Sequence, residues 1–462
     1  MVSFAQLSSR HSRIVAVIAL LGAPARAHAL QPLADFLAGA RTASVDDREA
    51  RLIAVAQDSN AVAALSRNLP AFTARGTYTH NQFEVDFPVG MGPPLLLQPL
   101  DQFDAFLQLD VPIVDSGSFL RTRAARADAR AAKHNAQATV LDVEKQVARF
   151  YYQIIGAEAL RRSAERNLAA AQANADLLVE RRAGGIATEL DVARASSEVE
   201  RARQNIADAV LASELSRRAL RTLTGIEAAG EAVAAVDDLH EEAPLAEWEA
   251  TPEARVPLLL AAAEAQRGAD ANALAAKLAL VPTLSATALE RFTNATAFLF
   301  GHDNIFSLAV NLTWHFDFTT MANIRTLATT AEIAAVRRER ARLAVRDQIH
   351  DAWERVRAGI AKGRAARAQV RAASLAAQYA TERYASGTGT QLDVVQAQRD
   401  EFAADVALIQ ADADLAFSRG LLRLSAGQPL DGAPGPPGSD LRGESPRKDG
   451  GAAGPQKGVD AR

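Results

Sequence analysis

The chain has 462 residues, a formal net charge of −4 and no cysteine. This length allows two or three ordinary domains, the charge gives no sign of a nucleic-acid partner, and the absence of cysteine excludes disulfides and a lipid-modified N-terminal cysteine. Apolar residues make up 48% and aromatic residues only 5%. Because much of the apolar content is alanine, which favours helix and lets helices approach closely, the composition predicts long, thin helical packing.

The N-terminus has the pattern of a secretory signal peptide. Basic residues between positions 10 and 13 precede the apolar run Ile14–Leu21, and the small-residue site Ala27-His28-Ala29 follows. We therefore expect residues 1–29 to be a signal peptide, with an amphipathic first helix as the alternative. No other run approaches the roughly 20 apolar residues of a membrane helix. The exported chain is then periplasmic, secreted, or an outer-membrane β-protein.

Strand-like runs of alternating polarity come in pairs. The clearest, Phe306–Phe316, has six apolar residues on one face and polar residues on the other, and its counterpart alternates over 105–113. The runs Phe72–Tyr78 and Thr283–Leu289 precede them. Eleven residues of period two match a tilted membrane strand, although an ordinary soluble sheet also alternates. Four strands cannot close a barrel and lipid permits no open edge, so a membrane barrel would require several chains.

A long helix is predicted after each pair of runs. After Asp115 no proline occurs until Pro244, and core-type residues step by four and three, with Arg161 as the one break. This is a heptad seam, and a helix over about 118–182 would be roughly 100 Å long at 1.5 Å per residue. A partner helix from Glu189 should complete an antiparallel hairpin. The clearest seam residues are Val143, Val147, Ile154 and Ala157 in the first helix and Val345, Ile349, Ala352 and Val356 in its counterpart.

The link between the two helices occurs twice in the chain. Gly184-Gly-Ile-Ala-Thr-Glu-Leu-Asp-Val192 returns as Ser386-Gly-Thr-Gly-Thr-Gln-Leu-Asp-Val394, at an offset of 387 − 185 = 202 residues. The same offset relates Asp115 to Asp317 and Gly225 to Gly427. Two units of about 110 residues therefore match without an insertion, which indicates an internal duplication.

Turn chemistry accounts for much of this motif. A glycine suits the left-handed residue that ends a helix, a threonine suits the N-cap of the next helix, and an aspartate three residues later can reach back to the cap. These residues are Gly185, Thr188 and Asp191 in the first copy and Gly387, Thr390 and Asp393 in the second. A turn alone accounts less well for the Leu-Asp-Val sequence that follows the threonine in both copies, at 190–192 and at 392–394. The tip of such a long rod is therefore also expected to be a docking point.

The sequence resembles the TolC-type outer-membrane efflux protein family over residues 30–427. The two motif copies, the duplication and the strand ends Ile113-Val-Asp115 and Phe316-Asp317 carry the resemblance. It implies a mainly α fold with a small β membrane part, built from duplicated strand-strand-long-helical-hairpin units. Three chains would form a homotrimer with a 12-stranded β-barrel, four strands per chain, that continues into a periplasmic α-helical tunnel.

The resemblance divides the chain as follows. A signal peptide (1–29) precedes a first repeat (30–225), which has a leading helix, a β-hairpin (about 69–115) and a helical hairpin (116–225). An equatorial linker (226–252), part of a belt around the tunnel, leads to a second repeat (253–427). That repeat has a helix, a β-hairpin (about 281–317) and a helical hairpin (318–427). The residues from 428 to 462, rich in Pro, Gly and charge, are expected to be a disordered tail.

The resemblance also implies partners and a site. An inner-membrane transporter would deliver substrates, and a periplasmic adaptor that bridges transporter and tunnel would dock on the tunnel tips. The tip residues would be Gly185, Ile186, Thr188, Gly387 and Thr390. Tyr384 and Asp393 match the family's constriction at the tunnel mouth, but Gly389 and Gln396 stand where that network has charged residues. We hypothesise a ring of three Asp393 carboxylates; a plain helix-start carboxylate is the alternative.

No sequence pattern indicates an enzyme, a cofactor or a metal site. The eight histidines are scattered without ligand spacing, and carboxylates such as Glu198 and Glu200 are interpreted as solvated flank charges. The expected function is a passive exit duct in the outer membrane of a Gram-negative bacterium, within a tripartite efflux or secretion system. A secreted coiled-coil scaffold or adhesin is the alternative. The sequence does not distinguish drug, metal, protein or peptide cargo.

Overall fold

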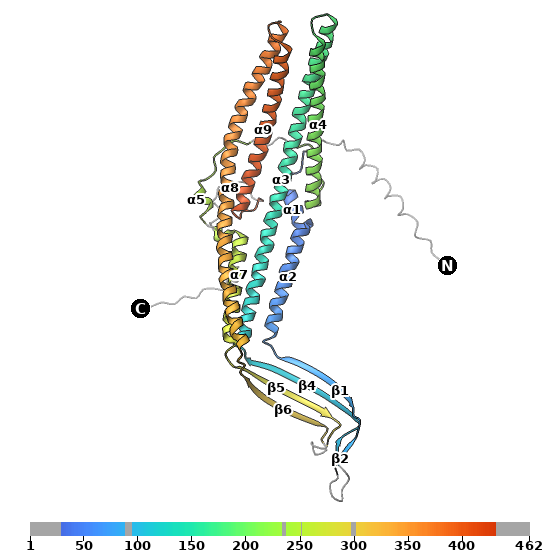
Figure 1. Ribbon diagram of the computed structural model, residues 1–462, viewed down its shortest axis with the longest axis vertical. Coiled ribbons are helices and arrows are strands. Elements are labelled where there is room, and N and C mark those ends of the chain that lie inside the picture. Colours follow the sequence, from blue (N-terminus) through green and yellow to red (C-terminus); the bar gives the residue numbers. More distant parts are fainter. Residues whose placement is uncertain (1–28, 88–94, 233–236, 251, 297–301, 431–462) are drawn as a thin grey trace, which may run out of the picture.

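Helices and strands occupy separate parts of the molecule. The computed structural model describes residues 29–87, 95–232, 237–250, 252–296 and 302–430. The helices form a long rod, and a sheet continues from one end of it (Figure 1). Most of the expected signal peptide and of the expected tail lies outside the described residues. Within the described part of the chain, no helix is both long enough and apolar enough to cross a membrane.

Two helical hairpins form the upper rod. The first consists of α3 (Ser116–Ala183) and α4 (Glu189–Thr224), and the second of α8 (Phe318–Ala385) and α9 (Gln391–Ser425). α3 and α8 have 68 residues each, which makes them about 100 Å long at 1.5 Å per residue. The predicted long helix over 118–182 is thus confirmed to within two residues at either end.

Shorter helices complete the lower rod. The leading helix expected in the first repeat is divided into α1 (Leu33–Ala43) and α2 (Val45–Ser66), because Ser44 caps α2 by accepting a hydrogen bond from the Asp47 N–H. α2 packs along α3, and α7 (Pro257–Leu278) packs against both α3 and α8. Two helical turns, α5 (Leu245–Trp248) and α6 (Pro252–Arg255), lie in and after the equatorial linker.

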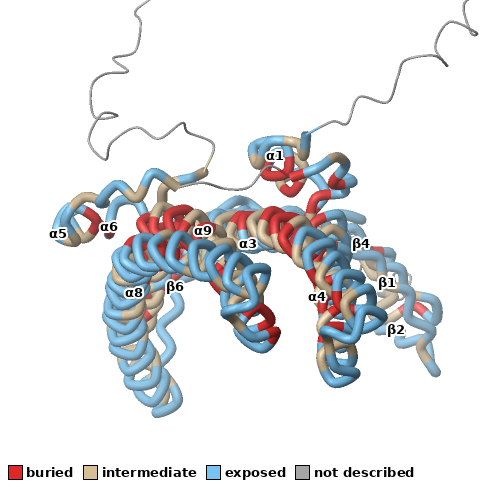
Figure 2. Tube along the Cα trace, turned by 90° about the horizontal axis from the view of Figure 1, so that it is seen from above, coloured by how far each residue is buried: buried red, intermediate tan, exposed pale blue. Residues whose placement is uncertain are grey.

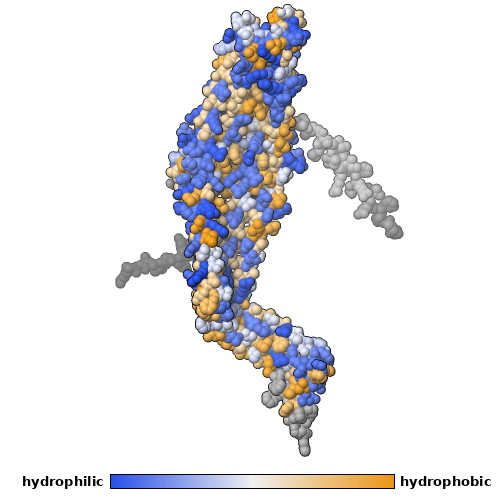
Figure 3. All heavy atoms as spheres, viewed as in Figure 1, coloured by the Kyte–Doolittle hydropathy of each residue, from blue (hydrophilic) through white to orange (hydrophobic). Residues whose placement is uncertain are grey.

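The core is a narrow seam and not a thick interior. The predicted heptad residues Val147, Ile154, Val345 and Ile349 are each at most 1% exposed, and two clusters that include Phe36 and Trp248 add larger buried side chains. On the outside, hydrophilic and hydrophobic residues are interspersed over the visible face of the rod (Figure 3). The alanine-rich composition is explained by this seam, since small side chains allow close helix approach along its whole length.

A buried carboxylate explains the break in the first seam at Arg161. Glu158 accepts hydrogen bonds from Arg161, from Ser213 on α4 and from Arg217 on α4, at 2.9 to 3.2 Å. Burial alone would raise the pKa of Glu158, but these donors outweigh it and hold that pKa below its ordinary value. Arg161 is therefore paired with Glu158, and Glu158 in turn joins α3 to α4 through Ser213 and Arg217.

The sheet contains four antiparallel strands in the order β1-β4-β5-β6. They are β1 (Ala71–His80), β4 (Asp101–Val114), β5 (Thr283–Thr293) and β6 (Asn304–Thr313). β4 pairs with β5, so strands from the two repeats lie side by side in one sheet. The expected loop 80–102 contains a further small ladder, β2 (Val85–Phe87) with β3 (Leu95–Gln98). The run predicted to extend to Phe316 leaves the ladder after Thr313.

The two faces of the sheet differ in polarity. One row across the four strands reads Phe72, Leu109, Ala288 and Leu308, and the next row on the other face reads Thr73, Gln108, Leu289 and Ser307. The second face also carries an ion pair from Arg291 to Asp104 at 2.8 Å. On the first face Leu308 and Leu312 are about 70% exposed. The register thus confirms the alternation read from the sequence and gathers apolar side chains on one side.

The equatorial linker follows the convex side of the rod. Seen along the rod, the upper helices form an arc, and α1, α5 and α6 lie on its convex side (Figure 2). Each upper helix has at least one arginine that bonds to the linker or its side chains. Four examples, one from each helix, are Arg162 to Ala232 O, Arg217 to Gly230 O, Arg364 to Glu241 and Arg419 to Asp237 and His240 O.

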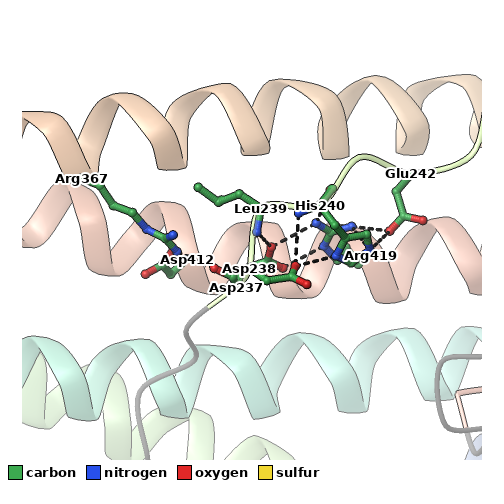
Figure 4. A network of polar contacts seen from close by, with 8 residues as sticks. All are labelled: Asp237, Asp238, Leu239, His240, Glu242, Arg367, Asp412 and Arg419. Carbon is green, nitrogen blue, oxygen red and sulfur yellow. Dashed lines mark hydrogen bonds and ion pairs between the residues drawn. The ribbon is translucent and has the colours of Figure 1, made fainter.

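Arg419 makes the most contacts of these four. Its guanidinium is 9% exposed and donates to both carboxylate oxygens of Asp237, at 2.8 and 3.0 Å, and to Glu242 (Figure 4). Burial opposes the charge of Arg419, but the two carboxylates outweigh it and raise its pKa. Leu239 lies between them at φ +59°, a left-handed conformation that is rare outside glycine. The contacts to Arg419 hold the linker in this shape.

Candidate functional site

The rod ends in two tight turns that belong to the repeated motif. In the first, Gly185 has φ +76° and the Ile186 N–H donates to Arg181 O at 2.8 Å, which closes the end of α3. In the second, Gly387 also has φ +76° and the Thr388 N–H donates to Arg383 O at 2.9 Å. The left-handed glycines predicted from the sequence are present in both turns, and the two turns have the same geometry.

Each turn leads into a reciprocal capping box. The Asp191 N–H donates to Thr188 Oγ1 at 3.2 Å, and Asp191 Oδ2 accepts from the Thr188 N–H at 3.1 Å. Thr390 and Asp393 make the same pair of bonds at 3.3 and 3.0 Å. The boxes begin α4 and α9. The tips are thus specified locally, and their outward atoms remain exposed.

The exposed part of each tip is small and partly apolar. Ile186 is 78% exposed, Leu190 57% and Leu392 50%. A Cβ at Gly185 or at Gly387 would meet no atom within 4 Å. An apolar side chain held out from a rigid turn at the end of a rod is suited to contact another protein, because little conformational entropy is lost on binding.

Tyr384 joins the two tips within one chain. Its ring lies under the guanidinium of Arg181 from the first hairpin, 4.6 Å from the ring centroid, which is a cation–π contact. Near it, Gln391 is 5% exposed and neither polar atom of its side chain has a hydrogen-bond partner. Tyr384 was assigned to the tunnel mouth from the sequence; within the chain it also bridges the hairpins.

Asp393 is an exposed helix-start carboxylate in the single chain. The backbone and side chain of Thr390 donate to it, and these bonds lower its pKa. The pKa of Asp191 is lowered in the same way by Thr188. A carboxylate with a lowered pKa stabilises the fold above its ordinary pKa and loses that contribution as the pH falls through the lowered value. Both caps are therefore fully charged at neutral pH.

Contacts below the tips correct one interpretation from the sequence. Glu198 was read as a solvated flank charge, but its side chain is 14% exposed and pairs with Arg399 of the second hairpin, Nε to Oε2 at 2.9 Å. Ser163 and Arg166 of the first hairpin likewise bond Asp405 of the second, at 2.8 and 3.3 Å. Sequence reasoning missed these pairs because their partners lie more than 200 residues away or on another repeat.

One acidic and histidine cluster was also missed. Asp237, Asp238 and His240 bring ligand-type atoms within 4.8 Å of one another. Arg419 already donates to both oxygens of Asp237, and His240 Nδ1 lies 2.5 Å from Asp238 Oδ1 (Figure 4). The positive charge that such a cluster needs is supplied by the arginine. In the described residues this cluster is a linker anchor.

Comparison with known proteins identifies the family. The family model described as outer membrane efflux protein matches residues 37–226 and 252–428. The chain belongs to this family. Membership places it in the outer membrane of a Gram-negative bacterium, with its helical rod in the periplasm, and assigns it to a family of efflux channels. A search of curated proteins found no match.

Solved structures have the same fold. The outer-membrane channel OprN is 19% identical with a TM-score of 0.74, over 87% of this chain and 91% of OprN. CusC is 17% identical with a TM-score of 0.76, over 86% and 92%. The outer-membrane channel CmeC of Campylobacter jejuni is 17% identical with a TM-score of 0.74, over 86% of each chain. The TM-scores show that this outer membrane efflux protein shares the fold of these channels.

The glycine at the tip has a testable conformational role. Gly185→Ala should destabilise the turn by about 1 kcal/mol, because an L side chain disfavours φ +76° even where space is free. Hydrogen exchange of the turn amides should then become about fivefold faster. Gly184→Ala is the control, since Gly184 has φ −82°. Equal effects of the two substitutions would contradict the assignment.

Proposed function

We propose that three copies of this outer membrane efflux protein form an exit duct. The observation that carries the proposal is a sheet with one apolar face and two free edges, continuous with a rod of paired helices. Three sheets would close a 12-stranded barrel in the outer membrane, and three pairs of hairpins would enclose a periplasmic tunnel. Substrates would be delivered by an inner-membrane transporter and would pass through the duct passively.

The faces of the sheet support this arrangement. The row Phe72, Leu109 and Leu308 would face lipid, and the face with the Arg291–Asp104 ion pair would line the aqueous lumen. Polar groups on that second face are mutually hydrogen-bonded, as Thr287 is with Asp110 at 2.9 Å. A secreted scaffold or adhesin would leave the apolar face in water, where so large a patch is unfavourable.

Opposite effects of charge on the two faces would test the duct. Leu308→Arg should cost about 3 kcal/mol per chain near the middle of the bilayer and greatly reduce insertion into the outer membrane. Ser307→Arg, one residue away on the other face, should assemble normally. Heat-resistant trimers in outer-membrane fractions provide the measurement, and pores in planar bilayers provide a second. Normal assembly of Leu308→Arg would contradict a lipid-facing role.

We infer that the tips are the docking points of a periplasmic adaptor. The residues concerned are Gly185, Ile186, Thr188, Gly387 and Thr390. The support is their position at the end of the rod, their rigid capping geometry and the exposed side chain of Ile186. The glycines allow a partner's backbone to approach the turn closely, because no Cβ covers it.

A photo-crosslinking amino acid at position 186 would test this docking. In the native host, it should give a covalent product with a periplasmic protein, identifiable by mass spectrometry, because Ile186 is 78% exposed. The same crosslinker in place of Thr79, on β1, is the control and should give no such product. Crosslinks at position 186 only to other copies of this chain would reject the docking role.

We propose that Tyr384 and Asp393 narrow the periplasmic mouth of the duct, with one Asp393 carboxylate from each chain. Like charges held close together favour cations. The absence of arginine at Gly389 and of aspartate at Gln396 makes this mouth less charged than the full family pattern. Asp393 would then have two roles, one in its own capping box and one in the ring.

A matched pair of substitutions separates these roles. Asp393→Asn should reduce the preference of the pore for cations, measured from reversal potentials in a salt gradient. Asp191→Asn is the control, since Asp191 occupies the same capping box in the other repeat. An unchanged preference in Asp393→Asn, or the same change in both variants, would reject the ring and leave only the cap.

The proposed duct is compatible with two classes of cargo. A proton-driven or ATP-driven transporter could use it for small molecules, and a one-step secretion system could use it for proteins or peptides. In either case the partners select which cargo enters the duct.

A further inference from the structure

The four upper helices enclose a groove on one side of the rod, and forming a passive duct would not need such a groove. A cavity of about 830 Å³ lies between α3, α4, α8 and α9 at the height of the equatorial linker. Pockets for small ligands commonly have volumes of about 300–1,000 Å³. The part of its lining used below consists of Phe150, Leu160, Leu215, Val406, Ile409 and Phe417.

Helix geometry places this groove on the concave side. Residues two positions apart on a helix point about 200° apart, which is nearly opposite. Each upper helix has a groove residue two positions before an arginine that holds the linker. The pairs are Leu160 and Arg162, Leu215 and Arg217, Lys362 and Arg364, and Phe417 and Arg419. Since the linker lies on the convex side (Figure 2), the groove faces the inside of the arc.

The charged residues of the groove are predominantly basic. Arg149, Arg355 and Lys362 line it together with one acidic residue, Asp414. In the described part of the chain none of these three cations makes an ion pair or a side-chain hydrogen bond, whereas Arg217 and Arg419 on the convex side have carboxylate partners. The groove therefore combines an apolar floor with free positive charge, although the chain as a whole has a net charge of −4.

We propose that this groove is a transit site for amphipathic organic anions, with the apolar group on Phe150, Ile409 and Phe417 and the anionic group among Arg149, Arg355 and Lys362. The proposal rests on the proposed duct, in which the concave side becomes the tunnel wall. Charge complementarity selects the occupant: three unpaired cations against one carboxylate favour an anion, and the apolar floor favours one with a ring or chain. Three copies would provide three such sites.

A transit site must bind weakly enough to release its ligand. In the proposed trimer the groove opens to the tunnel, and its lining combines apolar residues with long basic side chains, so it would hold a class of molecules and not one compound. Weak binding at an intermediate point assists conduction, because entry is favoured while exit is not prevented. The duct would then discriminate among cargoes by charge and hydrophobicity, independently of the transporter that delivers them.

The proposed transit site can be tested by measuring whether a probe anion blocks the current through single pores. The purified full-length trimer in a planar bilayer is exposed to 1-naphthalenesulfonate, an aromatic anion, and its unitary current is recorded. Methanesulfonate, which lacks the ring, and 1-naphthylmethylammonium, which reverses the charge, are the comparison probes. We expect reversible block by 1-naphthalenesulfonate at concentrations at which the other two probes have little effect.

Matched variants locate the block in the groove. Arg355→Gln combined with Lys362→Gln should weaken it roughly tenfold, as loss of charge-assisted contacts implies. Arg364→Gln, the same change on the opposite face of α8, should leave the block unchanged. If the double variant fails to form pores of wild-type conductance, Lys362→Gln alone should weaken the block roughly threefold.

The outcomes separate this proposal from the duct. Wild-type pores that are not blocked by 1-naphthalenesulfonate, or that are blocked equally by the aromatic cation, overturn the groove and leave the duct intact. The groove is also rejected, and the duct retained, if the groove variants do not weaken the block or if Arg364→Gln weakens it equally. A trimer that forms no pore overturns the duct and the groove together.

Discussion

A four-stranded sheet in lipid cannot satisfy the backbone hydrogen bonds of its two outer strands, and the proposed assembly follows from this constraint. β1 and β6 are the edges of the sheet and have ten residues each. In lipid, every unpaired N–H or C=O group is costly, so the edges must find partners. Because strand direction alternates over an even number of strands, β1 of one copy meets β6 of the next in the antiparallel sense. Identical copies can therefore continue the ladder until it closes.

The rod begins where two strands of the sheet end. β4 and β6 both run toward the periplasmic side, and each is followed at once by a long helix. Asp115 and Asp317 make these transitions by accepting a hydrogen bond from the backbone N–H of Ser118 at 2.8 Å and of Thr320 at 2.6 Å. In the proposed trimer, each chain would therefore contribute two helix starts to the rim of the barrel. Because the two repeats share this aspartate, α3 and α8 begin with the same cap.

Local features were predictable from the sequence, whereas features that join distant segments were not. The turns, the caps and the helix length follow from residues within one motif or one heptad seam, and the strand faces follow from alternation. The division of the leading helix at Ser44 depends on one side-chain bond, and the β2–β3 ladder depends on a pairing that short runs do not reveal. The roles of Glu198 and Arg419 depend on partners in other elements, so composition and spacing gave them no distinctive pattern.

The period of the helix explains how one rod can serve two surfaces. Arg162, Arg217 and Arg419 bind the linker on the convex side, and the apolar residue two positions before each arginine lies on the concave side. A mutation that shifted one helix by a single residue would rotate both sets by about 100° and disrupt them together. The linker therefore helps to set the rotation of α3, α4 and α9, and with it the residues that the proposed tunnel presents. Arg419, although remote from any passing molecule, helps to determine which side chains line the path.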